Sequence, residues 1–172
     1  MQMSYARFAA MIAVSTLVMF GLMYLNTYEI DHVFFSQTRA WMALLMGAVM
    51  AAIMLLFMWS MYRKRRANIA ILASAGLIFA VSLWLVRSQA TVDDVSYMKA
   101  MIPHHSIAIM TSTRAHIRDP RVRALADNIS RTQVREIAEM KALIEELERT
   151  PAARDAPELP AAPISNSDPS AR

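Results

Sequence analysis

The sequence contains no cysteine and only three glycines, and these absences exclude several kinds of functional site. Without cysteine the chain has no disulfide framework, and no thiolate can bind a metal. The glycines Gly21, Gly47 and Gly76 are far apart, so there is neither a P-loop nor a G-x-G-x-x-G fingerprint. The segment 91–149 also lacks the Glu-x-x-His pairs with which helical di-iron enzymes bind iron. We therefore expect a protein that is not an enzyme.

The excess of positive over negative charge is small, whereas hydrophobic residues are abundant. The chain of 172 residues is 56% hydrophobic, with a mean hydropathy of +0.29, and its apolar excess lies in the first half. The formal net charge is +4. Basic and acidic residues balance over 91–149, and the basic excess is concentrated in Arg63-Lys64-Arg65-Arg66. This pattern indicates a membrane protein and gives no reason to expect nucleic acid as a partner.

Three apolar stretches are each long enough to cross a bilayer as a helix, which takes about 20 residues. They cover roughly 8–25, 40–61 and 67–86. The first could be a signal peptide, but no A-x-A-like cleavage site follows it, so an uncleaved helix is favoured. The basic cluster 63–66 lies between the second and third stretches and predicts a cytoplasmic loop. We expect a multi-pass inner (plasma) membrane protein with a cytoplasmic N-terminus and its C-terminal region outside, in the periplasm of a Gram-negative host.

Two further helices are predicted beyond the membrane, over 91–113 and 120–149. Asp119-Pro120 is a typical helix start, with a capping side chain followed by proline at the first helical position. The second helix carries an apolar stripe, interrupted by Gln133, that consists of Val122, Leu125, Ile129, Ile137, Met140, Ile144 and Leu147. The proline-rich residues 150–172 are typical of a disordered tail. The chain thus divides into a membrane region (1–90), a helical pair (91–149) and a tail.

Candidate metal ligands gather in the first helix of this pair. The run from Met98 to Met110 combines thioethers with the adjacent imidazoles of His104 and His105, a donor set that suits a soft metal and above all copper. On a straight helix one patch contains Met98, Met101, His104 and His105. Met110 would face the opposite side, His116 lies further along, and Pro103 would bend or end the helix. The alternative is that the methionines fill the core and the histidines are solvated.

The same residues resemble a known family. The runs Tyr97-Met-Lys-Ala-Met-Ile-Pro-His-His105, Ala108-Ile-Met110, Asp119-Pro-x-Val-Arg-x-Leu-Ala126 and Gln133-x-x-Glu-Ile-x-x-Met140 are similar to the family catalogued as domain of unknown function number 305, over about 93–148. The resemblance implies a ferritin-like helical bundle, and some members are periplasmic copper-binding proteins. It implies that the metal ligands or their neighbours are Met101, His104, His105, Met110 and Met140, supported by Gln133 and Glu136. Longer members carry the helix pair twice, whereas this chain shows one unit.

The second apolar stretch carries a signal of its own. Methionines recur every four residues at Met42, Met46, Met50, Met54 and Met58, beside a row of small residues formed by Ala43, Gly47 and Ala51. The small residues predict close packing of membrane helices. The methionines are interpreted as apolar filler, with a thioether ladder that conducts Cu(I) as the minor alternative. His32, in the loop before this stretch, is interpreted as an interfacial residue rather than an added ligand.

These observations favour a membrane-anchored, periplasm-facing copper-binding protein that acts in copper tolerance, storage or delivery. Its cofactor would be copper, with Cu(I) favoured over Cu(II), and its partners would be periplasmic copper donors or acceptors. A structural membrane protein whose helix pair only drives oligomerisation is the alternative. Because the helix pair has little core by itself, we also expect a homodimer or higher homo-oligomer.

Overall fold

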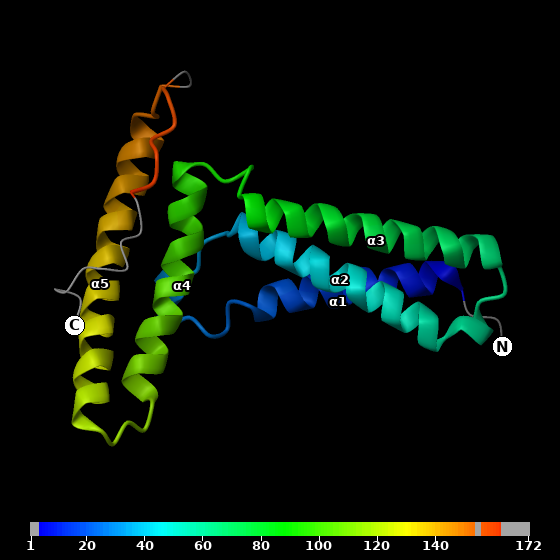
Figure 1. Ribbon diagram of the computed structural model, residues 1–172, viewed down its shortest axis with the longest axis horizontal. Coiled ribbons are helices and arrows are strands. Elements are labelled where there is room, and N and C mark those ends of the chain that lie inside the picture. Colours follow the sequence, from blue (N-terminus) through cyan, green and yellow to red (C-terminus); the bar gives the residue numbers. More distant parts are fainter. Residues whose placement is uncertain (1–3, 154–155, 163–172) are drawn as a thin grey trace.

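The computed structural model describes residues 4–153 and 156–162, and this part of the chain is all-helical without a strand. Three long helices lie alongside one another and a helical hairpin crosses one end of them (Figure 1). The long helices are α1 (Tyr5–Leu22), α2 (Gln37–Phe57) and α3 (Arg65–Ser88), and the hairpin is formed by α4 (Asp94–Arg114) and α5 (Pro120–Arg149). The predicted order of three membrane-length helices followed by a helical pair is confirmed.

All three long helices have the length and composition to cross a membrane. Their bounds differ from the predicted ones by a few residues, because local capping decides where each helix begins and ends. Ser36 is the N-cap of α2, and its hydroxyl accepts a hydrogen bond from the Arg39 N–H at 3.2 Å. At its other end α2 stops at Phe57, where the 3₁₀ turn η2 (Trp59–Met61) follows.

The row of small residues on α2 packs as predicted. Ala43 and Gly47 are buried, and a Cβ atom added at Gly47 would lie 2.3 Å from Thr16 Oγ1 on α1. The glycine therefore permits the close approach of α1 to α2. The outward faces of the three helices carry large apolar side chains, such as Leu17, Leu56 and Leu77, that are more than half exposed. Exposure of this kind suits contact with lipid.

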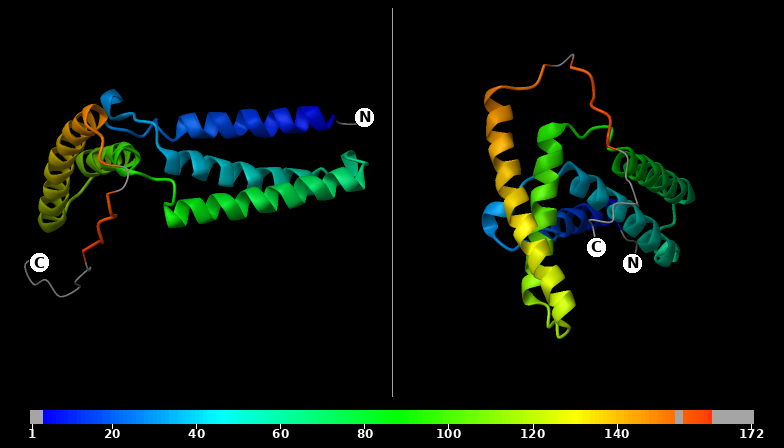
Figure 2. Two further views of the ribbon diagram at one scale, coloured as in Figure 1. Left: turned by 90° about the horizontal axis from the view of Figure 1, so that it is seen from above. Right: turned by 60° about the vertical axis from the view of Figure 1, so that its left-hand side comes forward.

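The bundle of long helices has two different ends. The N-terminus of α1 and the basic cluster 63–66 lie at the end remote from the hairpin (Figures 1 and 2). The loop 23–36, which includes the 3₁₀ turn η1 (Ile30–His32), lies at the hairpin end. Across a membrane, the basic cluster and the hairpin would thus be on opposite sides, in agreement with the relative placement expected from charge.

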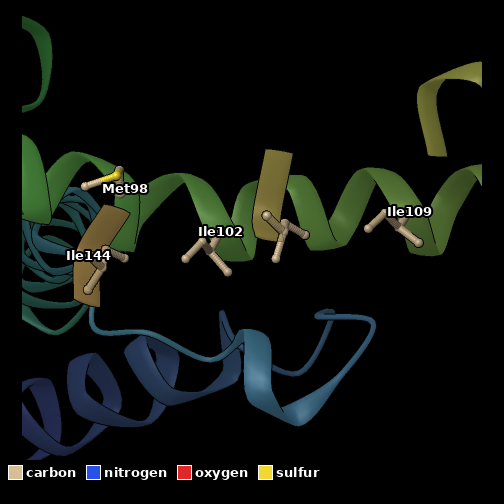
Figure 3. Close-up of a cluster of buried hydrophobic side chains, with 5 residues drawn as sticks. Met98, Ile102, Ile109 and Ile144 are labelled. Atoms are coloured by element: carbon tan, nitrogen blue, oxygen red, sulfur yellow. The ribbon is translucent and has the colours of Figure 1, made fainter. Parts of the chain in front are cut away.

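Capping side chains define the hairpin. Asp93 caps α4 by accepting a hydrogen bond from the Ser96 N–H at 2.7 Å, and Asp119 caps α5 by accepting one from the Arg121 N–H at 2.8 Å. Pro103 lies inside α4 without ending it, so the alternative of two separate helices does not occur. The hairpin core consists of Met98, Ile102, Ile109, Ile137 and Ile144 (Figure 3 labels all but Ile137).

Only part of the predicted apolar stripe on α5 is buried. Ile137 and Ile144 are buried and Met140 and Leu147 pack against the core, but the earlier half of the stripe, Val122, Leu125 and Ile129, is exposed. A single facing helix is too narrow to cover the whole stripe. Residues 151–153 and 156–162 of the predicted tail form no helix or strand, and 154–155 and 163–172 lie outside the described residues.

Candidate metal centre

A polar cluster crosses the hairpin at its middle and contains one of the two adjacent histidines. His105 lies on α4 with only 12% of its side chain exposed, and its Nε2 is 2.9 Å from Oε2 of Glu136 on α5. The Gln133 amide also donates to Oε2 of Glu136 at 3.4 Å. The structure therefore brings together His105, Glu136 and Gln133, the three residues that the sequence pattern grouped.

The hydrogen bonds of His105 decide what its ring can do. Its Nδ1 lies 3.0 Å from the backbone carbonyl oxygen of Met101, which can only accept a hydrogen bond. Its Nε2 faces the Glu136 carboxylate. Both ring nitrogens are therefore occupied by acceptor groups of the protein. A metal would bind Nε2 only after displacing Glu136.

The predicted patch of four ligands is divided between different environments. Met98 is only 6% exposed and packs in the hairpin core, where Ile102 and Ile144 are its neighbours (Figure 3). His104 is exposed to solvent, and its ring centroid lies 6.2 Å from that of His105. Met101 is half-buried between these two extremes. Met101, His104 and His105 are thus at least partly accessible on α4, whereas Met98 is directed into the core.

The remaining predicted ligands lie at different heights along the hairpin. Met140 packs against the core from α5. Met110 is half-buried, and a helical rise of about 1.5 Å per residue places it roughly 7 Å along α4 from His105. His116 is exposed in the turn after α4 ends, about 14 Å or more along the axis from His105. One ion bound at His105 is out of reach of His116.

The methionine ladder of α2 lines a shallow apolar groove. This groove has a volume of about 400 Å³, and its lining includes Met46, Met50 and Met54 of α2 together with Met19 of α1. Met42 and the far end of the ladder do not line this groove. The ladder is thus partly an interhelical packing surface, as the filler interpretation expects.

A second group of ligating side chains, outside the predicted site, lies in the loop between α1 and α2. His32 is buried beside the carboxylates of Glu29 and Asp31. The hydrogen bond from Lys141 Nζ to Asp31 Oδ2, at 2.6 Å, lowers the pKa of Asp31 below its usual value. The interpretation of His32 as a plain interfacial residue overlooked the Glu-x-x-His spacing of Glu29-Ile-Asp-His32, which is the sequence signal for this group.

The hairpin region matches the model of a known family. Residues 94–169 match the family described as domain of unknown function (DUF305). This region of the chain is therefore similar to that family, as its sequence motifs predicted. The match begins at the first residue of α4 and includes the whole hairpin.

A curated protein is also similar to part of this chain. It is an uncharacterized protein, L153, of Acanthamoeba polyphaga mimivirus, 39% identical over 71 residues. The aligned part is 40% of this chain and 47% of the relative, so the chain spans about half the length of the curated relative it matches. No solved structure matches the chain.

Proposed function

We propose that this protein is a membrane-anchored copper-binding protein whose hairpin faces the periplasm and acts in copper tolerance, storage or delivery. The observation that supports the proposal is the accessibility of three neighbouring donors on α4, because His104 is exposed and Met101 and His105 are only partly buried. Imidazole and thioether together suit copper, and the uncharged sulfur favours Cu(I). An oxidising compartment suits such a site, because it does not depend on free thiols.

The thioether and imidazole donors are ligands that copper accepts, but one of them is occupied by another side chain. His104 is exposed and Met101 is half-buried, so both can reach an ion at the hairpin surface. His105 can join them only if its Nε2 leaves Glu136, which lies 2.9 Å away. Once released, Glu136 would stay beside the ion as a charged neighbour. Met140 and Met110 would be neighbours of such a site, and copper bound there would be the cargo to be held or transferred.

The experiment compares copper binding by the full chain in detergent with that of His104→Ala, His105→Ala and the double variant. Binding of Cu(I) is measured by competition with a chromophoric Cu(I) chelator under anaerobic conditions. We expect the double variant to lose most of the affinity. Binding to the parent should weaken below about pH 6, because a metal must displace the imidazole proton, whereas a site of methionines alone would respond little. A double variant that binds Cu(I) as tightly as the parent would refute the proposed site.

Glu136→Gln separates copper binding from a structural pairing of the helices. Glutamine can still contact His105 but carries no charge, so a metal that binds Nε2 has to displace only a neutral partner. The copper-binding proposal predicts unchanged or tighter Cu(I) binding in this variant. Loss of binding together with loss of helicity would instead assign the Glu136–His105 pair to the stability of the hairpin.

A structural, oligomerising membrane protein without metal chemistry is the second candidate, and one observation favours it. Leu125 and Ile129 on α5 are 59% and 36% exposed, although they lie outside the membrane-length helices. With Val122 and Leu143 they form an apolar flank that a second copy could cover. Metal titration of the purified protein distinguishes the two candidates, since the second predicts association without any bound copper.

A further inference from the structure

We propose that Glu29, Asp31 and His32 form a second metal site, separate from the proposed copper site on α4, that takes a divalent transition ion of the Zn²⁺ class. One imidazole nitrogen and two carboxylate oxygens lie within 4.8 Å of one another in the loop between α1 and α2. The 3₁₀ turn η1 brings them together, because residues three apart are on the same side of such a helix.

The distances within this group fit a shared ion better than a hydrogen bond. Nε2 of His32 is 3.7 Å from Asp31 Oδ1 and 3.8 Å from Glu29 Oε2. Both are longer than a hydrogen bond. Two ligands that are each about 2.0–2.2 Å from one zinc ion lie roughly 3–4 Å apart. By contrast, His105 and Glu136 do form a hydrogen bond, and there the distance from Nε2 to Oε2 is 2.9 Å.

Burial and a hydrogen bond to Ser106 orient the His32 ring. Its side chain is only 9% exposed, and its Nδ1 lies 3.0 Å from Oγ of Ser106, a residue of α4 that is fully buried. Ser106 Oγ is itself held by the Tyr28 N–H at 2.7 Å. An ion bound to Nε2 would select the tautomer in which Nδ1–H donates to Ser106 Oγ. An outer hydrogen bond of this kind orients metal-binding histidines in general.

Lys141 of α5 completes the surroundings without occupying the site. Its Nζ binds Oδ2 of Asp31, whereas Oδ1 is the oxygen that faces His32. Asp31 can therefore hold an ion through one oxygen while the other remains paired with the lysine. A mixed nitrogen and oxygen donor set without thioether or thiolate prefers borderline divalent ions to Cu(I). This preference distinguishes the loop site from the proposed copper site.

The test uses the full chain in detergent, stripped of metal, in the His104→Ala/His105→Ala background so that the hairpin histidines cannot bind the probe. Zn²⁺ affinity is measured by competition with a chromophoric zinc indicator. We expect one Zn²⁺ per chain. Asp31→Asn and Glu29→Gln, which change exposed side chains, should each weaken binding by at least 10-fold. Ser106→Ala should lower the affinity for Zn²⁺ by about 10–100-fold, because it removes an outer hydrogen bond of the His32 ring.

Lys141→Gln is the matched control for Asp31→Asn. Both variants remove the Lys141–Asp31 ion pair, but only Asp31→Asn removes a proposed ligand. Zn²⁺ binding in Lys141→Gln should equal or exceed that of the background protein. The proposal is overturned if the background protein binds no Zn²⁺, or if Asp31→Asn binds as tightly as Lys141→Gln. Circular dichroism confirms that each variant remains helical.

Discussion

Met98 and Met101 provide the sharpest comparison, because they are three residues apart on one helix and yet have different surroundings. Met98 is 6% exposed and is one of the five side chains that form the hairpin core. Met101 is half-buried and lies within one helical turn of His104 and His105 in the sequence. We therefore predict that Met98 stabilises the fold and that Met101 binds Cu(I).

Leucine replaces a thioether with hydrocarbon of similar volume, so it removes a ligand but keeps the packing. Met98→Leu should cost less than about 1.5 kcal/mol in the free energy of unfolding and leave Cu(I) affinity unchanged. Met98→Ala opens a cavity in a small core and should cost about 2–5 kcal/mol. At about 4–8 °C per kcal/mol for a small domain, the alanine variant should have a Tm lower by about 8 °C or more.

Met101→Leu should show the opposite pattern. Its stability should change little, and its loss of affinity relative to the parent should be larger for Cu(I) than for Cu(II). Unfolding is followed by circular dichroism of the detergent-solubilised protein, and Cu(I) affinity by chelator competition. If Met98→Leu weakened Cu(I) binding as much as Met101→Leu does, Met98 would be a ligand despite its burial, and the division between core and site would be wrong.

Four further predictions concern topology, assembly, packing and pH. A reporter enzyme that works only outside the cytoplasm should be active when fused after Arg149 and silent after Arg66; the reverse result would place the hairpin in the cytoplasm. Cross-linking in membranes should trap a homodimer or a higher closed oligomer, and a folded, metal-loaded protein that stayed monomeric would contradict this. Gly47→Val should destabilise the bundle by about 1–3 kcal/mol, whereas Gly76→Val, with open space around it, should not. Asp93→Ala should cost about 1 kcal/mol at neutral pH, measured by thermal unfolding. Hydrogen bonds from the Ser96 N–H lower the pKa of Asp93, so its stabilisation is present above the ordinary value of about 3.9 and is lost as the pH falls through the lower, folded-state pKa.

The sequence alone determined the features that depend on neighbouring residues. Long apolar runs predict membrane-length helices wherever they occur, and Asp119-Pro120 set the start of α5 at the residue where the structure has it. The four-residue spacing of small side chains on α2 likewise predicted its contact face, because a helix repeats every 3.6 residues regardless of its partner. These signals are local, so no knowledge of the packing was needed.

Only the tertiary structure decided which side of each helix meets a partner. The spacing of Met98, Met101, His104 and His105 placed them on one patch, but the position of α5 buries the first and leaves His104 in solvent. The pairing of His105 with Glu136 depends on the register of the hairpin across 31 residues. The loop group depends on a contact between His32 and Ser106, which are 74 residues apart. Contacts of this range arise from the packing of whole elements, and a periodicity within one element carries no information about them.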